Sequence, residues 1–500
     1  MMRCLALGLL TLAVACAQAD PGRIRVEQGE AQGVVRDGVR IFRSLPYAAA
    51  PVGALRFRAP QPAPDWDGVR DATAPGPLCT QNTEGAAWGP WTGALAPSGP
   101  VSEDCLTLSV WTPAQAAGEQ LPVMVWIPGG GFTDGGEAMR VYDGEALARR
   151  GIVVVSINYR LNAFGLLTHP ALEVEADGAR GNYLLRDALA ALGWVNRNIA
   201  IFGGDPERVT IAGQSAGGAI AYALLDAPQA SGLFAGAILQ SFPPGSHTLP
   251  DRPTAEENGR AAAASINAES AQALRAAPAE QLLGLHDGLD LHVDGVLISN
   301  TTLAAPPYVN DVPIMAGITA DELSFLSPDL ARYRREADTH GDGYVALYRA
   351  DDDVSGADAY LRANRERAMV GLERWARATQ GGAPLYLYLW GHAPPGEEAS
   401  TYRAFHSSEV MYMFGALDAA PERGFTDEDR AISERMLDHW ANFVKRGDPN
   451  GTGSALWPRA DVDAPVFMDL GGGFTPLAPL PEPVRTFWNA RFDAENAYRF

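Results

Sequence analysis

The stretch VTIAGQSAGGAIAYALL, residues 209–225, contains one serine in a glycine-rich turn between an apolar run and a helical segment. Ser215 is flanked by Gly213 and Gly217, which gives the pattern G-x-S-x-G. Small flanking residues allow a sharp strand-to-helix bend from which a serine hydroxyl can project as a nucleophile. The alternative is a packing turn that happens to contain a serine. The other residues of the chain must decide between the two.

A serine hydroxyl needs a base to attack, and the base needs an acid that orients it. Chains with this turn carry the acid and then the base after the serine. Asp321 and Glu322 follow the apolar run 312–319, where a strand of a parallel sheet would end at the site. Four histidines lie well beyond the serine: His340, His392, His406 and His439. His439 falls inside a helical stretch and His340 in a polar loop, so His392 and His406 remain open as the base.

An oxyanion generated at the serine would need backbone N–H donors. The segment PVMVWIPGGGF ends an apolar run in three glycines, residues 129–131. A glycine run at that place can turn several N–H groups toward one point. The alternative is a flexible connection.

The elements that must position these residues alternate between strands and helices. Six short apolar runs predict buried strands: 121–128, 151–159, 209–215, 235–241, 312–319 and 384–390. Their continuous apolar character is typical of a parallel sheet covered on both faces. Residues 183–199 and 428–447 predict helices, the second ending at Gly447. The alternation indicates an α/β fold, and the polar helical segments 251–290 and 328–382 are expected to lie over the site.

The N-terminus has the three parts of a secretory signal peptide. Arg3 is basic, residues 4–16 are apolar, and Ala17, Gln18 and Ala19 form a small-residue cleavage site. We therefore expect a signal peptide over 1–19, a single domain over 20–500, and a secreted or periplasmic protein. Lipid attachment at Cys16 and a buried N-terminal helix are the alternatives. No other apolar stretch is long enough to span a bilayer.

Charge and cysteine content narrow the range of partners. A formal net charge of −21 disfavours nucleic acid and anionic membrane surfaces as partners.

Removal of the signal peptide leaves two cysteines, Cys79 and Cys105. In an exported protein two cysteines are expected to pair, although two buried thiols are the alternative, and they cannot build a metal site alone.

Several motifs occur together in a recognisable order. They are EDCLTLSVWTP (103–113), WIPGGGF (126–132), SINYRLNAFGLL (156–167), GNYLLRDALAALGWVNRNIAIFGGDPERVTIAGQSAGG (181–218), GITADELSF (317–325) and WANFVKRGDPNGTGSALWP (440–458). Over nearly the whole mature chain the sequence resembles the type-B carboxylesterase family of α/β hydrolases, which includes cholinesterases, bacterial para-nitrobenzyl-type esterases and fumonisin esterases. The resemblance implies an α/β-hydrolase fold with a mostly parallel sheet.

The resemblance also implies roles for individual residues. It assigns Ser215 as the nucleophile, Glu322 as the acid and His406, the histidine of H-x-x-E, as the base. The implied oxyanion donors are the N–H groups of Gly130, Gly131 and Ala216. The implied loop disulfide joins Cys79 to Cys105.

The sequence departs from the family pattern at three positions. Pro128 precedes the glycines where many members have His or Tyr, which predicts a stiffer entry to the loop. Gln214 precedes the serine where many members have Glu, so a fixed negative charge beside the nucleophile is missing. Leu323 follows the acid in place of a frequent glycine.

The predicted reaction is acyl transfer from a small-molecule ester to water, with no metal or organic cofactor. Because Gln214 is uncharged, we expect neutral or anionic esters to be preferred. A non-catalytic binding module and hydrolysis of amides or lactones are the alternatives. The sequence does not identify the natural ester, the use of amides or lactones, or the oligomeric state.

Overall fold

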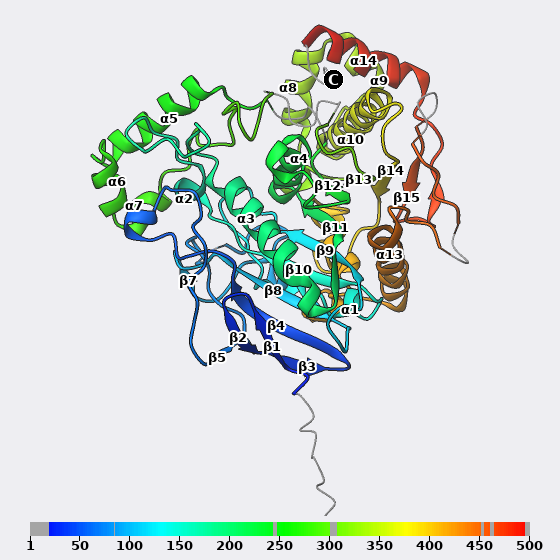
Figure 1. The fold of residues 1–500 in the computed structure, drawn as a ribbon. Helices are drawn as coiled ribbons and strands as arrows, with labels where there is room; N and C mark the ends of the chain where they lie inside the picture. The colour runs from blue at the N-terminus through cyan, green and yellow to red at the C-terminus, as the bar shows by residue number, and fades with distance from the viewer. Residues whose placement is uncertain are drawn as a thin grey trace, which may run out of the picture.

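In the computed structural model, which describes residues 20–84, 86–243, 248–300, 308–451, 455–460 and 465–495, the core is an eleven-stranded sheet (Figure 1). Its spatial order is β16 (Thr475–Pro476), β15 (Phe467–Asp469), β14 (Leu385–Trp390), β13 (Ile314–Thr319), β12 (Gly236–Gln240), β11 (Gly204–Gln214), β9 (Leu121–Ile127), β10 (Val153–Ile157), β8 (Thr107–Thr112), β4 (Val39–Pro46) and β3 (Val34–Arg36). The six predicted strands are confirmed as β9 to β14.

The centre of the sheet is parallel and its edges are antiparallel. Strands β10, β9, β11, β12, β13, β14 and β15 pair in parallel, whereas β8, β4, β3 and β16 join by antiparallel ladders. Parallel strands need crossover connections, and the helices that supply them cover both faces of the sheet. This accounts for central strands without a polar face.

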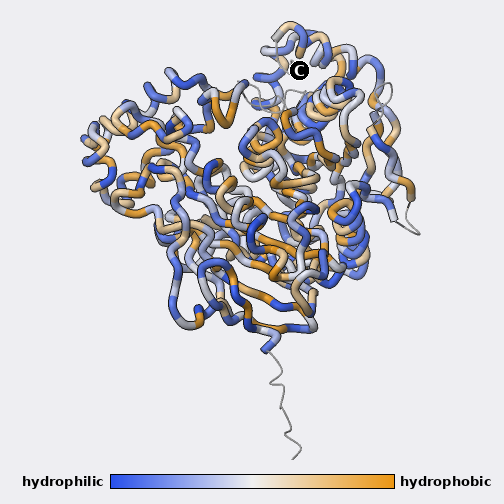
Figure 2. The backbone as a smooth tube through the Cα atoms, in the orientation of Figure 1, coloured by the Kyte–Doolittle hydropathy of each residue, from blue (hydrophilic) through white to orange (hydrophobic). Residues whose placement is uncertain are grey.

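Alternate side chains of each strand enter two different hydrophobic clusters. In β9, Val123, Val125 and Ile127 pack with helices α3 (Tyr183–Asn198) and α4 (Ala216–Asp226), whereas Met124 and Trp126 pack on the opposite side. Elements α1 (Glu145–Ala148), α12 (Val410–Met413) and α13 (Asp427–Arg446) cover that second side. Apolar residues accordingly concentrate in the middle of the molecule (Figure 2). The period of two along the strand therefore fills both cores at once.

The helices predicted over 183–199 and 428–447 are confirmed as α3 and α13. Thr426 caps the start of α13 in a reciprocal capping box with Asp429. Gly447 ends the helix at a φ of 68°, the left-handed conformation that glycine adopts without strain.

The two helical segments form satellite clusters beside the sheet. The first segment contains α5 (Arg252–Ser265), α6 (Ala271–Ala276) and α7 (Ala279–Leu283). These helices pack with α2 (Asn162–Leu166) around a hydrophobic cluster of their own. The second contains α8 (Leu330–His340), α9 (Asp342–Leu347) and α10 (Asp353–Ala378), which pack with α14 (Glu482–Glu495). Figure 1 shows the first group at one flank of the molecule and the second near the C-terminus.

The N-terminal part adds two small sheets and a covalent link. Strands β1 (Arg23–Val26), β2 (Gly29–Gln32) and β5 (Val69–Asp71) form one sheet, and β6 (Leu78–Cys79) pairs with β7 (Val101–Ser102) in the other. Cys79 and Cys105 form a disulfide with Cα atoms 5.0 Å apart, so the expected pairing is present. The signal-peptide expectation and Cys16 lie outside the described residues. Within the described part of the chain, no helix has the length and apolar character needed to cross a bilayer.

The disulfide closes a loop with a sequence separation of 26 that contains little regular structure. We predict that replacing both Cys79 and Cys105 by serine lowers the unfolding free energy by about 3–4 kcal/mol, because the unfolded chain gains loop entropy. Denaturant unfolding of the two proteins measures the difference. Peptide mass spectrometry of exported, unreduced protein supplies the direct check, and a pair of free thiols there would contradict the linkage.

Candidate active site

Ser215 lies in a strained turn between β11 and α4. Its φ is 55° and its ψ is −123°, a sparsely populated conformation for a residue with a side chain. A Cβ at Gly213 would collide with the Gly217 carbonyl, and one at Gly217 would collide with the Ile127 carbonyl. The two glycines of the G-x-S-x-G pattern are therefore required by close backbone approach. Ser215 N–H donates to the Gln240 carbonyl at 2.9 Å, which fixes the turn to β12.

The glycine run after β9 folds into a compact loop beside this turn. Gly130 and Gly131 have φ values of 118° and 60°. The N–H groups of Thr133 and Asp134 donate to the Gly130 carbonyl at 2.9 and 3.0 Å and close the loop. Within the described residues, the N–H groups of Gly130 and Gly131 donate to no protein acceptor. Ala216 N–H adds a third donor at the first turn of α4, where helices leave N–H groups unpaired.

Pro128, which departs from the family pattern, is held in place by a buried tyrosine. Tyr159 Oη–H donates to the Pro128 carbonyl at 2.6 Å. This hydrogen bond holds the carbonyl at the entry to the glycine loop. The stiffer entry that the proline ring predicts stays a prediction.

Glu322 and His406 meet because their two loops are joined by backbone hydrogen bonds. Asp321, two residues after the end of β13, donates its N–H to the carbonyl of Ala404 at 3.1 Å, in the segment that follows β14 and α11 (Ala399–Tyr402). Glu322 follows Asp321 by one residue and His406 follows Ala404 by two, and the Glu322 Oε2 and His406 Nδ1 atoms form a hydrogen bond. The other carboxylate oxygen accepts from Thr319 N–H at 2.8 Å. An acid oriented from both sides therefore holds the imidazole.

The alternative acid, Asp321, faces another partner. Its Oδ2 accepts from Ala404 N–H at 3.3 Å, so the carboxylate contributes to joining the loops. Leu323, where a glycine is frequent in the family, has a φ of −102° and therefore needs no glycine. The structure brings Glu322, and not Asp321, to His406.

The contact between Glu322 and His406 lowers the pKa of the carboxyl and raises the pKa of the imidazole. Burial disfavours the Glu322 carboxylate, but the charge of His406 and its hydrogen bond outweigh burial and lower the pKa of Glu322. Burial likewise disfavours the imidazolium, but Glu322 outweighs it and raises the pKa of His406 above 6.5. The environment therefore stabilises a cationic imidazole, which is the form a base adopts after taking a proton.

Gln214 contacts the remaining nitrogen of the imidazole. Gln214 Nε2 lies 3.1 Å from His406 Nε2, so the amide N–H can donate to the lone pair of a neutral ring that carries its proton on Nδ1. Ser215 Oγ has no hydrogen bond to His406 in the described residues. The missing charge of Gln214 was evident from the sequence, whereas this contact was not. Hydrogen bonds to a catalytic base are often completed only when substrate binds.

The other three candidate histidines have different partners. His392 Nε2 contacts Asp429 Oδ1 at 2.7 Å, His439 Nδ1 contacts the Pro449 carbonyl at 2.9 Å, and the His340 ring stacks on Tyr344. His406 is the one of the four that lies beside Ser215 in a cavity.

Glu409 is a buried carboxyl that the sequence analysis missed as a separate group, although it is the glutamate of H-x-x-E. Gln240 Nε2 donates to its Oε1 at 3.0 Å. Burial and the nearby charge of Glu322 raise the pKa of Glu409 to about 7. A second carboxyl close to His406 can therefore change charge near neutral pH.

The cavity over Ser215 has a volume of about 290 Å³. Trp88, Trp91 and Phe325 form one aromatic wall, with the Trp91 ring centroid 4.6 Å from that of Trp88 and 5.0 Å from that of Phe325. Both tryptophans thus line the cavity. Asp134 is the one carboxylate among the described lining residues, and no lysine or arginine is among them.

The helical segments 251–290 and 328–382 were expected to lie over the site. None of their described residues lines the cavity, whose wall comes from the 79–105 loop, the glycine loop and the segments around Phe325 and His406. Hydrophobic clusters of their own hold those helices beside the sheet.

Comparison with known proteins points to one family. The model of the carboxylesterase family matches residues 18–352 and 342–476. Carboxylesterase 5A of Canis lupus familiaris is 33% identical over 90% of this chain and 85% of its own length. Fumonisin B1 esterase of Sphingopyxis macrogoltabida is 33% identical over 91% and 87%. Cocaine esterase of Oryctolagus cuniculus is 34% identical over 85% and 86%.

We predict that the pKa of His406 lies above the ordinary histidine value of 6.5. Because the pKa of His406 is raised, the imidazole should be cationic below a pH that lies above 6.5 and neutral above that pH. Glu409→Gln removes a negative charge close to the ring and should lower this pKa. Glu373→Gln, a buried carboxyl contacted by Arg377 and Arg485, is the matched control and should leave it unchanged. NMR titration of the imidazole nitrogens measures it, and a His406 pKa at or below 6.5 would contradict the electrostatic account.

Proposed function

Because this chain belongs to the carboxylesterase family and is a carboxylic ester hydrolase, we propose that it works on an α/β-hydrolase fold with Ser215 as nucleophile, His406 as base and Glu322 as orienting acid. The observation that carries the proposal is the Glu322–His406 hydrogen bond at the wall of the cavity to which Ser215 belongs. A nucleophile, a base and an orienter within one cavity are the parts that acyl transfer requires.

The first half of the reaction forms an acyl-enzyme. As Ser215 Oγ attacks the ester carbonyl carbon, His406 Nε2 takes the hydroxyl proton and Glu322 stabilises the resulting imidazolium. The tetrahedral intermediate then expels the alkoxide, which leaves as an alcohol with the proton from His406. In the second half, water attacks the acyl group by the same route and releases the carboxylic acid and free Ser215.

The N–H groups of Gly130, Gly131 and Ala216 are the proposed oxyanion donors. Their support is that the two glycine N–H groups have no acceptor in the described residues and that Ala216 begins α4. Donors fixed before reaction stabilise the charge that develops on the carbonyl oxygen without reorganisation during the step.

Gln214 must release the base during each proton transfer. The amide N–H that approaches His406 Nε2 competes with the Ser215 hydroxyl for the same lone pair. A substrate that seats the serine hydroxyl against the ring would displace that contact. Rotation of the amide would then present its oxygen to the protonated nitrogen.

The cavity favours neutral esters. The sequence also allowed anionic esters, but the described lining contains no lysine or arginine to receive one, and Asp134 would repel a nearby carboxylate. The aromatic wall of Trp88, Trp91 and Phe325 suits an apolar acyl or alcohol group.

We further propose that residues 1–19 are removed on export to a secreted or periplasmic location and that residues 20–500 form one domain.

Kinetics of single variants test the assignment. We expect Ser215→Ala and His406→Ala each to lower kcat by about 10⁵–10⁶-fold without unfolding the protein, as for loss of a nucleophile or base in a comparable triad. Glu322→Gln should lower kcat by a smaller factor, because the acid acts only through the imidazole. The matched controls Asp321→Asn and His392→Ala should be mild. Retention of most activity by folded Ser215→Ala, or greater loss in either control than in its partner, would refute the assignment.

Charge at position 214 should set selectivity between cationic and neutral alcohols. Two unit charges about 4 Å apart interact by about 4 kcal/mol at an effective dielectric of 20, before desolvation. We therefore predict that Gln214→Glu shifts kcat/KM toward a choline ester relative to its 3,3-dimethylbutyl isostere. Gln229→Glu adds the same charge at an exposed position and is the control. Faster hydrolysis of the choline ester than of its isostere by the natural enzyme at physiological salt would contradict the role given to Gln214.

A further inference from the structure

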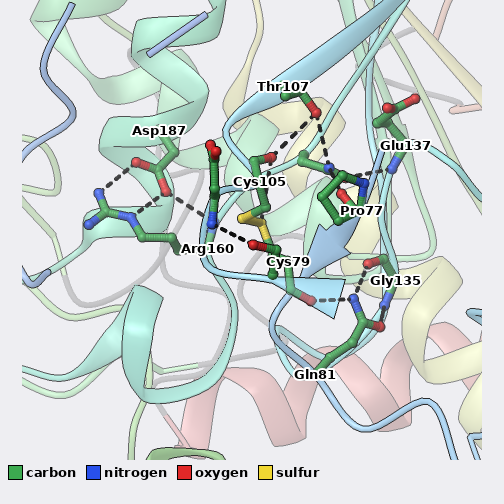
Figure 3. The surroundings of a disulfide bond; sticks show 12 residues. Pro77, Cys79, Gln81, Cys105, Thr107, Gly135, Glu137, Arg160 and Asp187 are labelled. Atoms are coloured by element: carbon green, nitrogen blue, oxygen red, sulfur yellow. Dashed lines mark hydrogen bonds and ion pairs between the residues drawn. A yellow bond between two sulfur atoms is a disulfide. The ribbon is translucent and has the colours of Figure 1, made fainter. Parts of the chain in front are cut away.

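Gln81 joins the disulfide to the glycine loop beside Ser215. It lies two residues after Cys79 and is 3% exposed. Its Nε2 donates to the Gly135 carbonyl at 2.7 Å, and its Oε1 accepts from the Gly135 N–H at 2.8 Å. The same Nε2 donates to the Cys79 carbonyl at 2.9 Å. Figure 3 shows the Gln81 carboxamide between Gly135 and the chain at the disulfide.

The two bonds to Gly135 imitate the pairing of neighbouring strands. One donor and one acceptor of the carboxamide satisfy both backbone polar groups of one buried residue, Gly135. The third bond ties the carboxamide to the carbonyl of Cys79, so three contacts fix one side chain. A side chain held in this way positions its partner more rigidly than a single hydrogen bond does.

Gly135 transmits this constraint to the oxyanion donors. It has a φ of 98°, and a Cβ at this residue would collide with the Gly129 carbonyl. Gly129 immediately precedes Gly130 and Gly131, and the turn at Thr133 and Asp134 closes back on the Gly130 carbonyl. A displacement of Gly135 therefore has little room to occur without moving the loop that carries those donors.

A second connection runs parallel to the first. Glu137 N–H donates to Asn158 Oδ1 at 2.8 Å, and Asn158 Nδ2 donates to the Pro77 carbonyl at 3.2 Å. Pro77 lies two residues before Cys79, so both connections end beside the disulfide (Figure 3). Side chains of Gln81 and Asn158 thus hold the chain that follows the glycine loop at residues 135 and 137.

We propose that Gln81 is a positioning residue for the oxyanion hole, through which the Cys79–Cys105 disulfide holds the glycine loop in its reactive geometry. The inference rests on the proposed function, because it assumes that the Gly130 and Gly131 N–H groups receive the oxyanion. Such donors must lie close to the final position of the oxygen, so a small shift of the loop weakens transition-state binding more than substrate binding.

Two variants separate the parts of the contact. Gln81→Met keeps the length of the side chain and loses all three hydrogen bonds, whereas Gln81→Glu keeps an acceptor for Gly135 N–H and loses the donors. We expect kcat to fall by about 10–100-fold in Gln81→Met and by less in Gln81→Glu, with KM nearly unchanged. Gln28→Met removes a buried carboxamide that bonds Trp194, away from the cavity, and should leave both constants unchanged.

A transition-state analogue distinguishes positioning from general loosening. The inhibition constant of an alkyl boronic acid should rise in proportion to the loss of kcat/KM across the Gln81 variants. The affinity for the product alcohol, which does not occupy the oxyanion position, should stay constant. Equal weakening of both ligands, or unchanged kcat in folded Gln81 variants, would overturn the proposal. Should Gln81→Met fail to fold, Gln81→Glu decides by the same comparison.

The disulfide completes the test. If Gln81 transmits the effect of the disulfide to the glycine loop, the two sets of changes should not act independently. The loss of kcat in a protein with Gln81→Met, Cys79→Ser and Cys105→Ser should then be smaller than the product of the loss in Gln81→Met and the loss in the double cysteine variant. Fully multiplicative losses would contradict the connection. Labelling of Ser215 by a fluorophosphonate in the natural enzyme tests the proposed function separately. Absent labelling would refute that function, whereas normal labelling with unaffected Gln81 variants would refute the inference alone.

Discussion

The backbone turn at Ser215 holds a residue with a side chain at φ 55° and ψ −123°, a conformation that costs about 1–3 kcal/mol. Only close packing around the turn keeps it populated. Gly213 and Gly217 let backbone carbonyls approach where a Cβ would collide, and β9 contributes one of those carbonyls from Ile127. The position of the serine, the start of α4 and the end of β9 are consequently one structural unit, and the rest of the site is arranged around it.

The remaining groups reach the serine because parallel strands end on the same edge of the sheet. Strand β9 leads to the glycine loop, β11 to Gln214 and Ser215, β13 to Glu322, and the segment after β14 to His406. Beyond the end of β13, Asp321 contacts residues 404 and 405 in a separate isolated bridge, which brings Glu322 and His406 together. The site thus depends on strand order more than on any single loop. The loop closed by the disulfide contributes the two tryptophans of the aromatic wall. Through the hydrogen bonds of Gln81 to Gly135 it also contributes the proposed support of the proposed oxyanion donors.

Much of this arrangement could be predicted from the sequence, and the failures have physical reasons. Continuous apolar runs identified the six central strands, because a strand buried on both faces has no polar side to obscure it. The residues alone left both His392 and His406 open, since only the pairing of distant loops reveals which histidine meets Glu322 and which meets Asp429. The contacts of Gln214 and Gln81 were not predictable, because a carboxamide has no charge or period that indicates its partner. The helical segments were misplaced over the cavity because amphipathic patterns show that a face is buried, not which neighbour buries it.

The central claim is that an ester passes through a covalent acyl group on Ser215. The most direct measurement is rapid acid quenching of the enzyme during turnover of p-nitrophenyl trimethylacetate, a slowly deacylated ester, followed by peptide mass spectrometry. The account predicts a trimethylacetyl group on the peptide that contains Ser215, in an amount equal to the initial burst of p-nitrophenol. Turnover with no acylated peptide, or an acyl group carried by a different residue, would contradict it.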